Sequence, residues 1–297
     1  MVQTLAGVGV PRRELVRFIA VSQPHAGDFL NSVPKSEPFR IQTWALQIVV
    51  QKRLGLPLTV AAGAAGLRSK SGSVFDAYGD VAQNDGAQGH QTRHFLILNS
   101  LADAMRRAYG AMAQKEPSNY HDYSDTRPDL TLLRDGLRAF DLKVLCPVGS
   151  VAGEVAQRGA FVAMGNTSEE AAALVRGRLQ RGEASDGAFK RFNGTGYVPQ
   201  KDGAYKRAQA CGVDVSEWLV ETFGGLGERL VADLQEAGEY RSNQLTAAEY
   251  DETTWSARTW LTFVYQRLSV AVHKAVAREV QLALGFSAAV DPRGARE

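Results

Sequence analysis

The stretch Arg127–Leu145, RPDLTLLRDGLRAFDLKVL, contains the local pattern that decides the fold. Its apolar run Leu130–Leu133 is followed by Asp135-Gly136, a dipeptide typical of tight hairpin turns. The next run, Leu137–Val144, alternates and ends before Pro147. We therefore predict two antiparallel strands over these two runs, joined by a tight turn.

The predicted hairpin places two carboxylates close together. Counting back from the turn puts Asp129 roughly opposite Asp141, and Lys143 follows two residues later on the same face of its strand. Mg²⁺ prefers oxygen ligands such as carboxylates, and a lysine can orient an attacking water or steady phosphate charge. This set suits metal-dependent phosphodiester hydrolysis, although the pattern read in isolation fits strand ends with solvated charges equally well.

Helical periodicity, with Gly and Pro near the ends, predicts several helices around the hairpin. The clearest is Thr92–Tyr109, in which Phe95, Leu98 and Met105 are expected on the core side. Further helices are predicted at Pro11–Val21, Ile41–Leu54, Ser168–Gln180, Ala204–Cys211, Gly227–Ala237 and Trp255–Leu284, with a strand at Val213–Thr222 and loops at Ala61–Gly89 and Gly182–Gln200. The result is an α/β fold with helical regions at both ends.

Composition is that of an ordinary globular chain. Of its 297 residues 44% are hydrophobic and 22% charged, and the formal net charge is +2, which gives nucleic-acid binding only faint support. Two cysteines, Cys146 and Cys211, exclude a disulfide scaffold and an all-cysteine zinc site. No signal peptide or membrane span is expected. We expect an intracellular protein in a reducing compartment, the nucleus if the source is eukaryotic.

More of the chain fits one family in a fixed order. The pattern resembles the PD-(D/E)xK restriction-like endonuclease domain of site-specific non-LTR retrotransposons and of related retrotransposon reverse-transcriptase polyproteins. The segments that carry this resemblance are Ser22–Gly27, Arg53–Pro57, Arg93-His94, Glu116-Pro117, Arg127–Leu130, Asp141, Lys201–Tyr205 and Glu221–Gly225. The order of these segments is more specific than any one of them.

The resemblance implies roles at the matching positions. Asp129, Asp141 and Glu116 would be the metal ligands, and Lys143 or Lys201 would be the catalytic lysine. The same resemblance implies nucleic-acid contacts by Arg93, His94, Arg127 and Tyr205, although a core tyrosine and a helix-start or core histidine are the plainer readings of Tyr205 and His94. The implied activity is endonucleolytic hydrolysis of DNA that depends on Mg²⁺, for which Mn²⁺ can substitute, in the mobility of a genetic element.

The chain also departs from that family. A cysteine- and histidine-rich zinc knuckle should precede Arg93, yet this region reads Ser69-Lys70-Ser71-Gly72, so we expect no structural zinc. Loss of the knuckle puts target recognition in doubt. The alternatives are a catalytically impaired nucleic-acid-binding module of the same fold, and an unrelated intracellular scaffold. The expected partners are DNA, a reverse transcriptase or element RNA, and a second copy in a homodimer, with no membrane.

These observations predict an α/β protein with a restriction-endonuclease-like mixed sheet flanked by helices. The expected regions are an N-terminal helical region (1–60), a degenerate zinc-knuckle-like loop region (61–90), the nuclease core (91–225) and a C-terminal helical extension (226–297).

Overall fold

The sheet contains the predicted hairpin and two further strands. The computed structural model describes residues 11–69, 72–84, 89–117, 127–148, 211–253 and 256–285. Within them, the strands are β1 (Ala113–Lys115), β2 (Leu130–Leu133), β3 (Leu137–Leu145) and β4 (Asp214–Glu221), in the spatial order β1-β2-β3-β4. β1, β2 and β3 pair antiparallel, whereas β3 and β4 pair parallel. The mixed sheet of the predicted α/β class is therefore confirmed.

The turn between β2 and β3 has the geometry that its sequence predicts. Asp135 has φ 53° and Gly136 has φ 117°. Leu133 pairs with Leu137, so the loop has three residues, 134–136, and the residues with positive φ are Asp and Gly, which reach that conformation at low cost. β3 ends at Leu145, one residue beyond the predicted bound.

The described helices are α2 (Arg12–Val21), α3 (Thr43–Leu54), α4 (Asp80–Asn84), α5 (His90–Tyr109), α10 (Glu228–Tyr240), α11 (Ala247–Thr253) and α12 (Trp260–Ala283). The predicted helices in these regions are confirmed, with shifted ends. α12 begins later than Trp255 because Thr259 caps it, its side chain accepting a hydrogen bond from the amide of Thr262. Three elements were missed: α11, α4 within the predicted loop, and the short strand β1. The expected helices at 168–180 and most of 204–211 lie outside the described residues.

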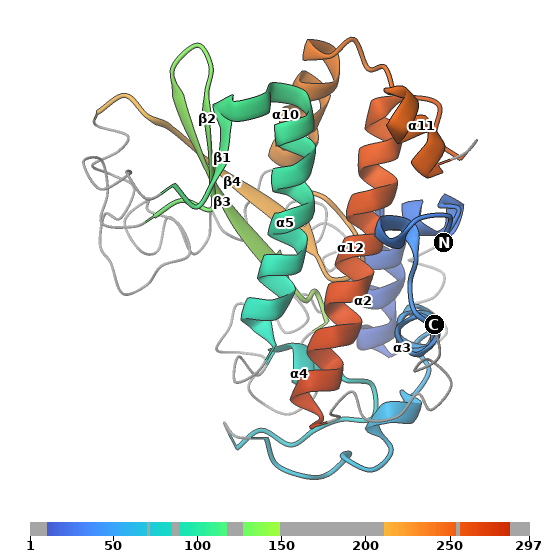
Figure 1. The fold of residues 1–297 in the computed structure, drawn as a ribbon. Coiled ribbons are helices and arrows are strands. Elements are labelled where there is room, and N and C mark those ends of the chain that lie inside the picture. Colours follow the sequence, from blue (N-terminus) through green and yellow to red (C-terminus); the bar gives the residue numbers. More distant parts are fainter. Residues whose placement is uncertain are drawn as a thin grey trace.

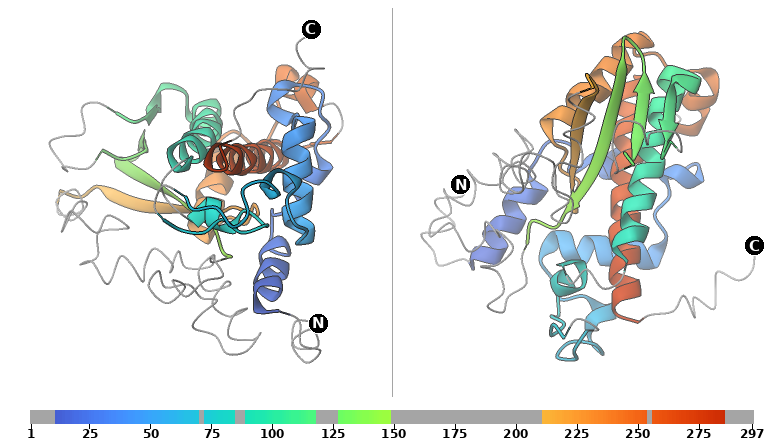
Figure 2. Two further views of the ribbon diagram at one scale, coloured as in Figure 1. Left: turned by 90° about the horizontal axis from the view of Figure 1, so that it is seen from below. Right: turned by 90° about the vertical axis from the view of Figure 1, so that its left-hand side faces the viewer.

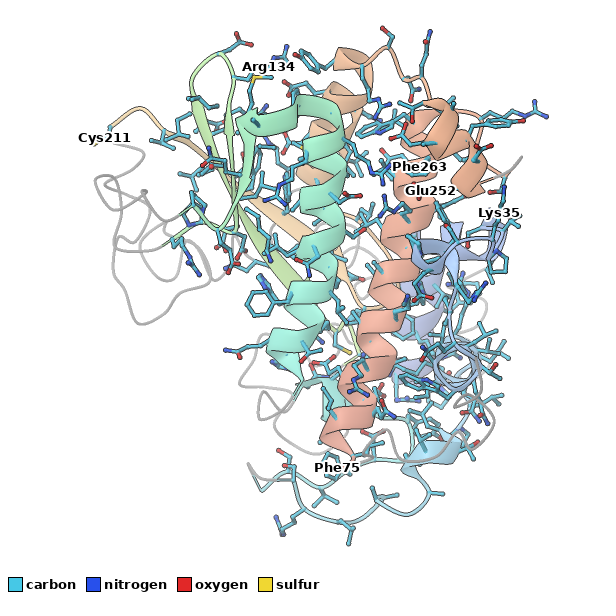
Figure 3. The ribbon with its side chains drawn as sticks, viewed as in Figure 1. Lys35, Phe75, Arg134, Cys211, Glu252 and Phe263 are labelled. Atoms are coloured by element: carbon cyan, nitrogen blue, oxygen red, sulfur yellow. The ribbon has the colours of Figure 1, made fainter. Side chains whose placement is uncertain are left out.

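One apolar cluster joins the sheet to the long helices. α5 covers one face of the sheet and α12 lies alongside α5 (Figures 1 and 2). Phe140 and Leu142 of β3 and Trp218 of β4 point into this cluster, as does the fully buried Phe263 of α12, which is labelled in Figure 3. We call this cluster, which also includes Trp260 of α12, the sheet cluster. By strand alternation, Asp141 and Lys143 point to the opposite face of the sheet.

A second apolar cluster packs the N-terminal helices against α12. It includes Ile48 of α3 and Phe29, which are buried together with Val270, Ala277 and Val280 of α12. We call it the N-terminal cluster. α12 thus contributes side chains to both clusters. No helix in the described ranges is long and apolar enough to cross a lipid bilayer.

Candidate active site

The open end of the hairpin brings Asp129 beside Asp141. Leu130 pairs with Phe140, so the next pair outward along the same register is Asp129 with Asp141. The amide of Asp129 donates to the carbonyl of Phe140 at 3.0 Å, and the carbonyl of Asp129 accepts from the amide of Glu116 at 2.9 Å. The backbone of Asp129 is therefore held from both neighbouring strands.

The carboxylate of Asp129 is held by two further contacts. Its Oδ2 accepts a hydrogen bond from the Leu142 amide at 2.7 Å and lies 3.1 Å from Nε2 of His94 on α5. Burial opposes ionisation of this carboxyl. The hydrogen bond and positive charge of His94, together with the Leu142 amide, outweigh burial and lower the pKa of Asp129. Asp129 therefore carries the negative charge in this arrangement.

Asp141 has a raised pKa. Its side chain is nearly buried, and its Oδ2 lies 2.5 Å from Nζ of Lys143. Burial raises the pKa of Asp141 to about 6, with the charge of Asp129 adding to the effect and Lys143 opposing it. The pKa values of the two neighbouring carboxyl groups therefore move apart, down for Asp129 and up for Asp141.

This carboxyl pair fits a hard divalent cation. Mg²⁺ in proteins is commonly held by one or two carboxylates, with waters and phosphate oxygens completing its coordination. A cation between Asp129 and Asp141 would relieve the repulsion that contributes, with burial, to the raised pKa of Asp141. The two residues named as metal ligands from the sequence thus offer a suitable donor set, in which Lys143 is already paired with one carboxylate.

Glu116, the third predicted ligand, forms ion pairs with basic neighbours through its carboxylate. Its carboxylate lies 3.1 Å from Arg127 and 3.5 Å from Nζ of Lys115. Across the described residues no group of three or more His, Cys, Asp and Glu side chains is arranged to hold a metal. Glu116 therefore stands apart from the carboxyl pair in this arrangement.

Arg93 requires a correction. It was predicted to contact nucleic acid, but only 5% of it is exposed, and its guanidinium lies 2.7 Å from Glu279 and donates to the carbonyl of Val144 at 3.1 Å. A buried arginine keeps its charge through such internal partners. The structure gives Arg93 a role in packing α5, α12 and β3 together, and no surface for a nucleic-acid contact.

The remaining predicted residues divide between this site and the undescribed part of the chain. His94 lies at the site through its contact with Asp129, and Arg127 lies beside Glu116, half-exposed at the surface. Lys201 and Tyr205 lie outside the described residues. Whether Lys143 or Lys201 would be the catalytic lysine therefore remains a prediction.

Two residues beside the site were missed. Phe95 was expected in the core but is 41% exposed, and Lys115 lies with its Nζ 5.3 Å from the centre of the Phe95 ring. Their positions next to His94 and Glu116 in the sequence were the available signal. Helical periodicity concealed it, because Phe95 is apolar and near the edge of the buried stripe.

Comparisons with known proteins add no identification. Neither models of protein families, nor curated proteins, nor solved structures gave a match to this chain. The function must therefore be argued from the residues themselves.

Proposed function

We propose that this protein is a Mg²⁺-dependent DNA endonuclease of the PD-(D/E)xK kind, with a restriction-endonuclease-like core, serving the mobility of a genetic element. The observation that carries the proposal is the carboxyl pair of Asp129 and Asp141, set across the open end of a hairpin with Lys143 paired to it. Perturbed pKa values such as those of Asp129 and Asp141 cluster at functional sites, which supports the proposal.

Each residue has a separate part in the proposal. Asp129 and Asp141 would hold the cation, which supplies charge neutralisation and an acidified water when bound. His94 keeps Asp129 ionised and oriented. Lys143 would balance the charge of Asp141 and, once a cation takes that place, meet the phosphate with its ammonium group. Arg127, exposed beside the site, would contact the DNA backbone.

The first experiment incubates the purified chain with supercoiled plasmid in Mg²⁺, Mn²⁺ or EDTA. Asp141→Asn keeps the shape of the side chain but removes the negative charge that would neutralise a cation. We expect metal-dependent nicking that falls by at least about 100-fold in this variant, as expected on losing an essential metal ligand. Nicking at the wild-type rate by Asp141→Asn would remove the site assignment.

Asp135→Asn provides the matched control. It makes the same chemical change at the far tip of the same hairpin, next to Arg134, which is labelled in Figure 3. Asp135 has a positive φ that asparagine also adopts readily. This variant should nick DNA like the wild type, which separates loss of the site from a general effect of lost charge.

A second candidate is a binding module of the same fold that no longer cleaves. The ion pair between Lys143 and Asp141 favours it, because the carboxylate is already neutralised without a metal. This candidate predicts DNA binding that weakens steeply as salt rises, with no nicking in either cation. Nicking lost in Asp141→Asn would decide against it. A partner reverse transcriptase, element RNA and a homodimer belong to the same proposal and are tested by co-purification and by mass measurement in solution.

A further inference from the structure

Phe95 presents an aromatic ring to solvent beside the carboxyl pair. Its neighbours Ile97 and Leu98 on α5 are fully buried in the described structure, whereas Phe95 is 41% exposed. The buried stripe of α5 is complete without Phe95. A single exposed apolar side chain is ordinary on a protein surface, so what distinguishes Phe95 is the set of side chains around it.

The surroundings of the ring are basic and polar. Nζ of Lys115 lies 5.3 Å from the ring centre and donates to Oδ1 of Asn99 at 2.8 Å. The His94 ring packs against Phe95 edge to face, with centroids 5.8 Å apart. We call Phe95, His94, Asn99 and Lys115 the Phe95 platform. Nζ of Lys115 also lies 3.5 Å from the carboxylate of Glu116, and Arg127 pairs with the same carboxylate.

His94 connects the platform to the candidate site. One side of its ring contacts Phe95, and its Nε2 lies 3.1 Å from Asp129. A phosphate placed at the carboxyl pair would therefore have a nucleotide's base within reach of the platform. Lys115 and Arg127 are both paired with Glu116, and together they carry more positive charge than that one carboxylate neutralises, which suits contact with a phosphodiester chain.

We propose that the Phe95 platform stacks an unpaired base, so that the site acts on single-stranded or frayed DNA in preference to intact duplex. Aromatic side chains stack on the faces of bases regardless of sequence, and adjacent cations track the backbone. In an intact duplex the base faces are covered by their neighbours, so only an unpaired nucleotide can use the ring. The inference rests on the proposed function, for which it names the form of the substrate.

The test measures binding in EDTA, so that cleavage plays no part. Fluorescence anisotropy is recorded with the full chain and two labelled probes, a single strand of about 16 nucleotides and a duplex of the same sequence. The wild type should bind the single strand more tightly. Phe95→Ala should weaken single-strand affinity roughly 5- to 150-fold, which is the range for loss of one stacked base, and leave duplex affinity within about twofold. Phe95→Trp should retain single-strand binding.

Leu96→Ala is the matched control. Leu96 is the adjacent residue on α5 and is similarly exposed, at 38%, but lies outside the platform. It should leave both affinities unchanged. The inference would be overturned by equal losses for the two probes in Phe95→Ala, or by the same loss in Leu96→Ala. It would also be overturned if Phe95→Ala left both affinities unchanged, and the exposed ring would then be assigned to contact with a protein partner.

The plasmid assay keeps the two proposals apart. Metal-dependent nicking lost in Asp141→Asn, together with unaltered strand preference in Phe95→Ala, retains the nuclease and rejects the platform. Binding by the wild type to neither probe also rejects the platform. Selective loss of single-strand binding in Phe95→Ala without any nicking supports the platform and rejects cleavage.

Discussion

At the residue scale, we predict that His273 of α12 makes the free energy of unfolding depend on pH in the acidic range. Its ring lies 4.0 Å from that of Phe29, and its Nδ1 lies 2.7 Å from the carbonyl oxygen of Ser269. Burial lowers the pKa of His273 to about 4; the hydrogen bond to Ser269 opposes the shift and the charge of Arg53 adds to it. In the unfolded chain the pKa returns to about 6.5. The stability that depends on neutral His273 is therefore present above pH 6.5 and lost as the pH falls through about 4.

The prediction is tested with His273→Asn, whose amide can still donate to the Ser269 carbonyl but does not titrate. The free energy of unfolding in urea should be higher for the wild type at neutral pH, because the variant loses packing against Phe29. That difference should shrink on acidification by up to roughly 3 kcal/mol, the value of a fully expressed shift of this size. A difference that is independent of pH would show that the pKa of His273 is the same in the folded and unfolded states, against this prediction.

The same scale shows how far sequence reasoning reaches at the site. Asp129 and Asp141 were paired correctly, because a tight turn fixes which residues of a hairpin lie opposite each other. The burial of Asp141 could not be predicted, since it depends on what covers that face of the sheet. Nor could the partner of Arg93, because Glu279 lies 186 residues away along the chain.

At the element scale, local pairings were predictable and distant ones were not. The hairpin follows from alternation and Asp135-Gly136, whereas the parallel pairing of β3 with β4 joins strands separated by a long stretch of sequence. A parallel pair needs a long crossover, which leaves no short turn signal to read. β4 itself was predicted from its composition, but its neighbour and direction were not.

The elements α5, α12 and β3 are held together by one buried ion pair. Arg93 of α5 contacts Glu279 of α12 and the Val144 carbonyl of β3, while burial raises the pKa of Glu279 to about 7 against the opposing charge of Arg93. Arg93→Ala leaves Glu279 buried without this partner. We expect the free energy of unfolding to fall by about 3–5 kcal/mol, as for other broken buried pairs.

Arg127→Ala is the comparison for that prediction. Arg127 is 53% exposed at its side chain, so its replacement should change stability by no more than about 0.5 kcal/mol and weaken DNA binding instead. Urea unfolding and DNA affinity are measured for both variants. Unchanged unfolding with weakened DNA binding in Arg93→Ala would restore the nucleic-acid role first predicted for that arginine.

At the scale of the whole molecule, α12 unites parts of the chain that the sequence separates. Regions 1–60, 91–225 and 226–297 were predicted from changes in local pattern. In the described structure, side chains of α12 enter both the sheet cluster and the N-terminal cluster. Composition and periodicity show that a helix has an apolar side, but they do not show which elements that side contacts.

Because the sheet cluster and the N-terminal cluster both include side chains of α12, we predict that they unfold together. Ile48 of α3 is fully buried in the N-terminal cluster, and Ile48→Ala should lower the free energy of unfolding by about 2–5 kcal/mol. Trp218 and Trp260 lie in the sheet cluster and report on it through fluorescence. A background with Trp44→Phe and Trp255→Phe leaves Trp218 and Trp260 as the only tryptophans in the signal. If α12 couples the clusters, Ile48→Ala shifts the fluorescence and far-UV circular dichroism transitions to the same lower urea concentration, since loss of one cluster exposes the apolar side of the helix that completes the other. A fluorescence transition that keeps its midpoint while circular dichroism separates into two steps would show that the clusters are independent and that the predicted regions are true folding units.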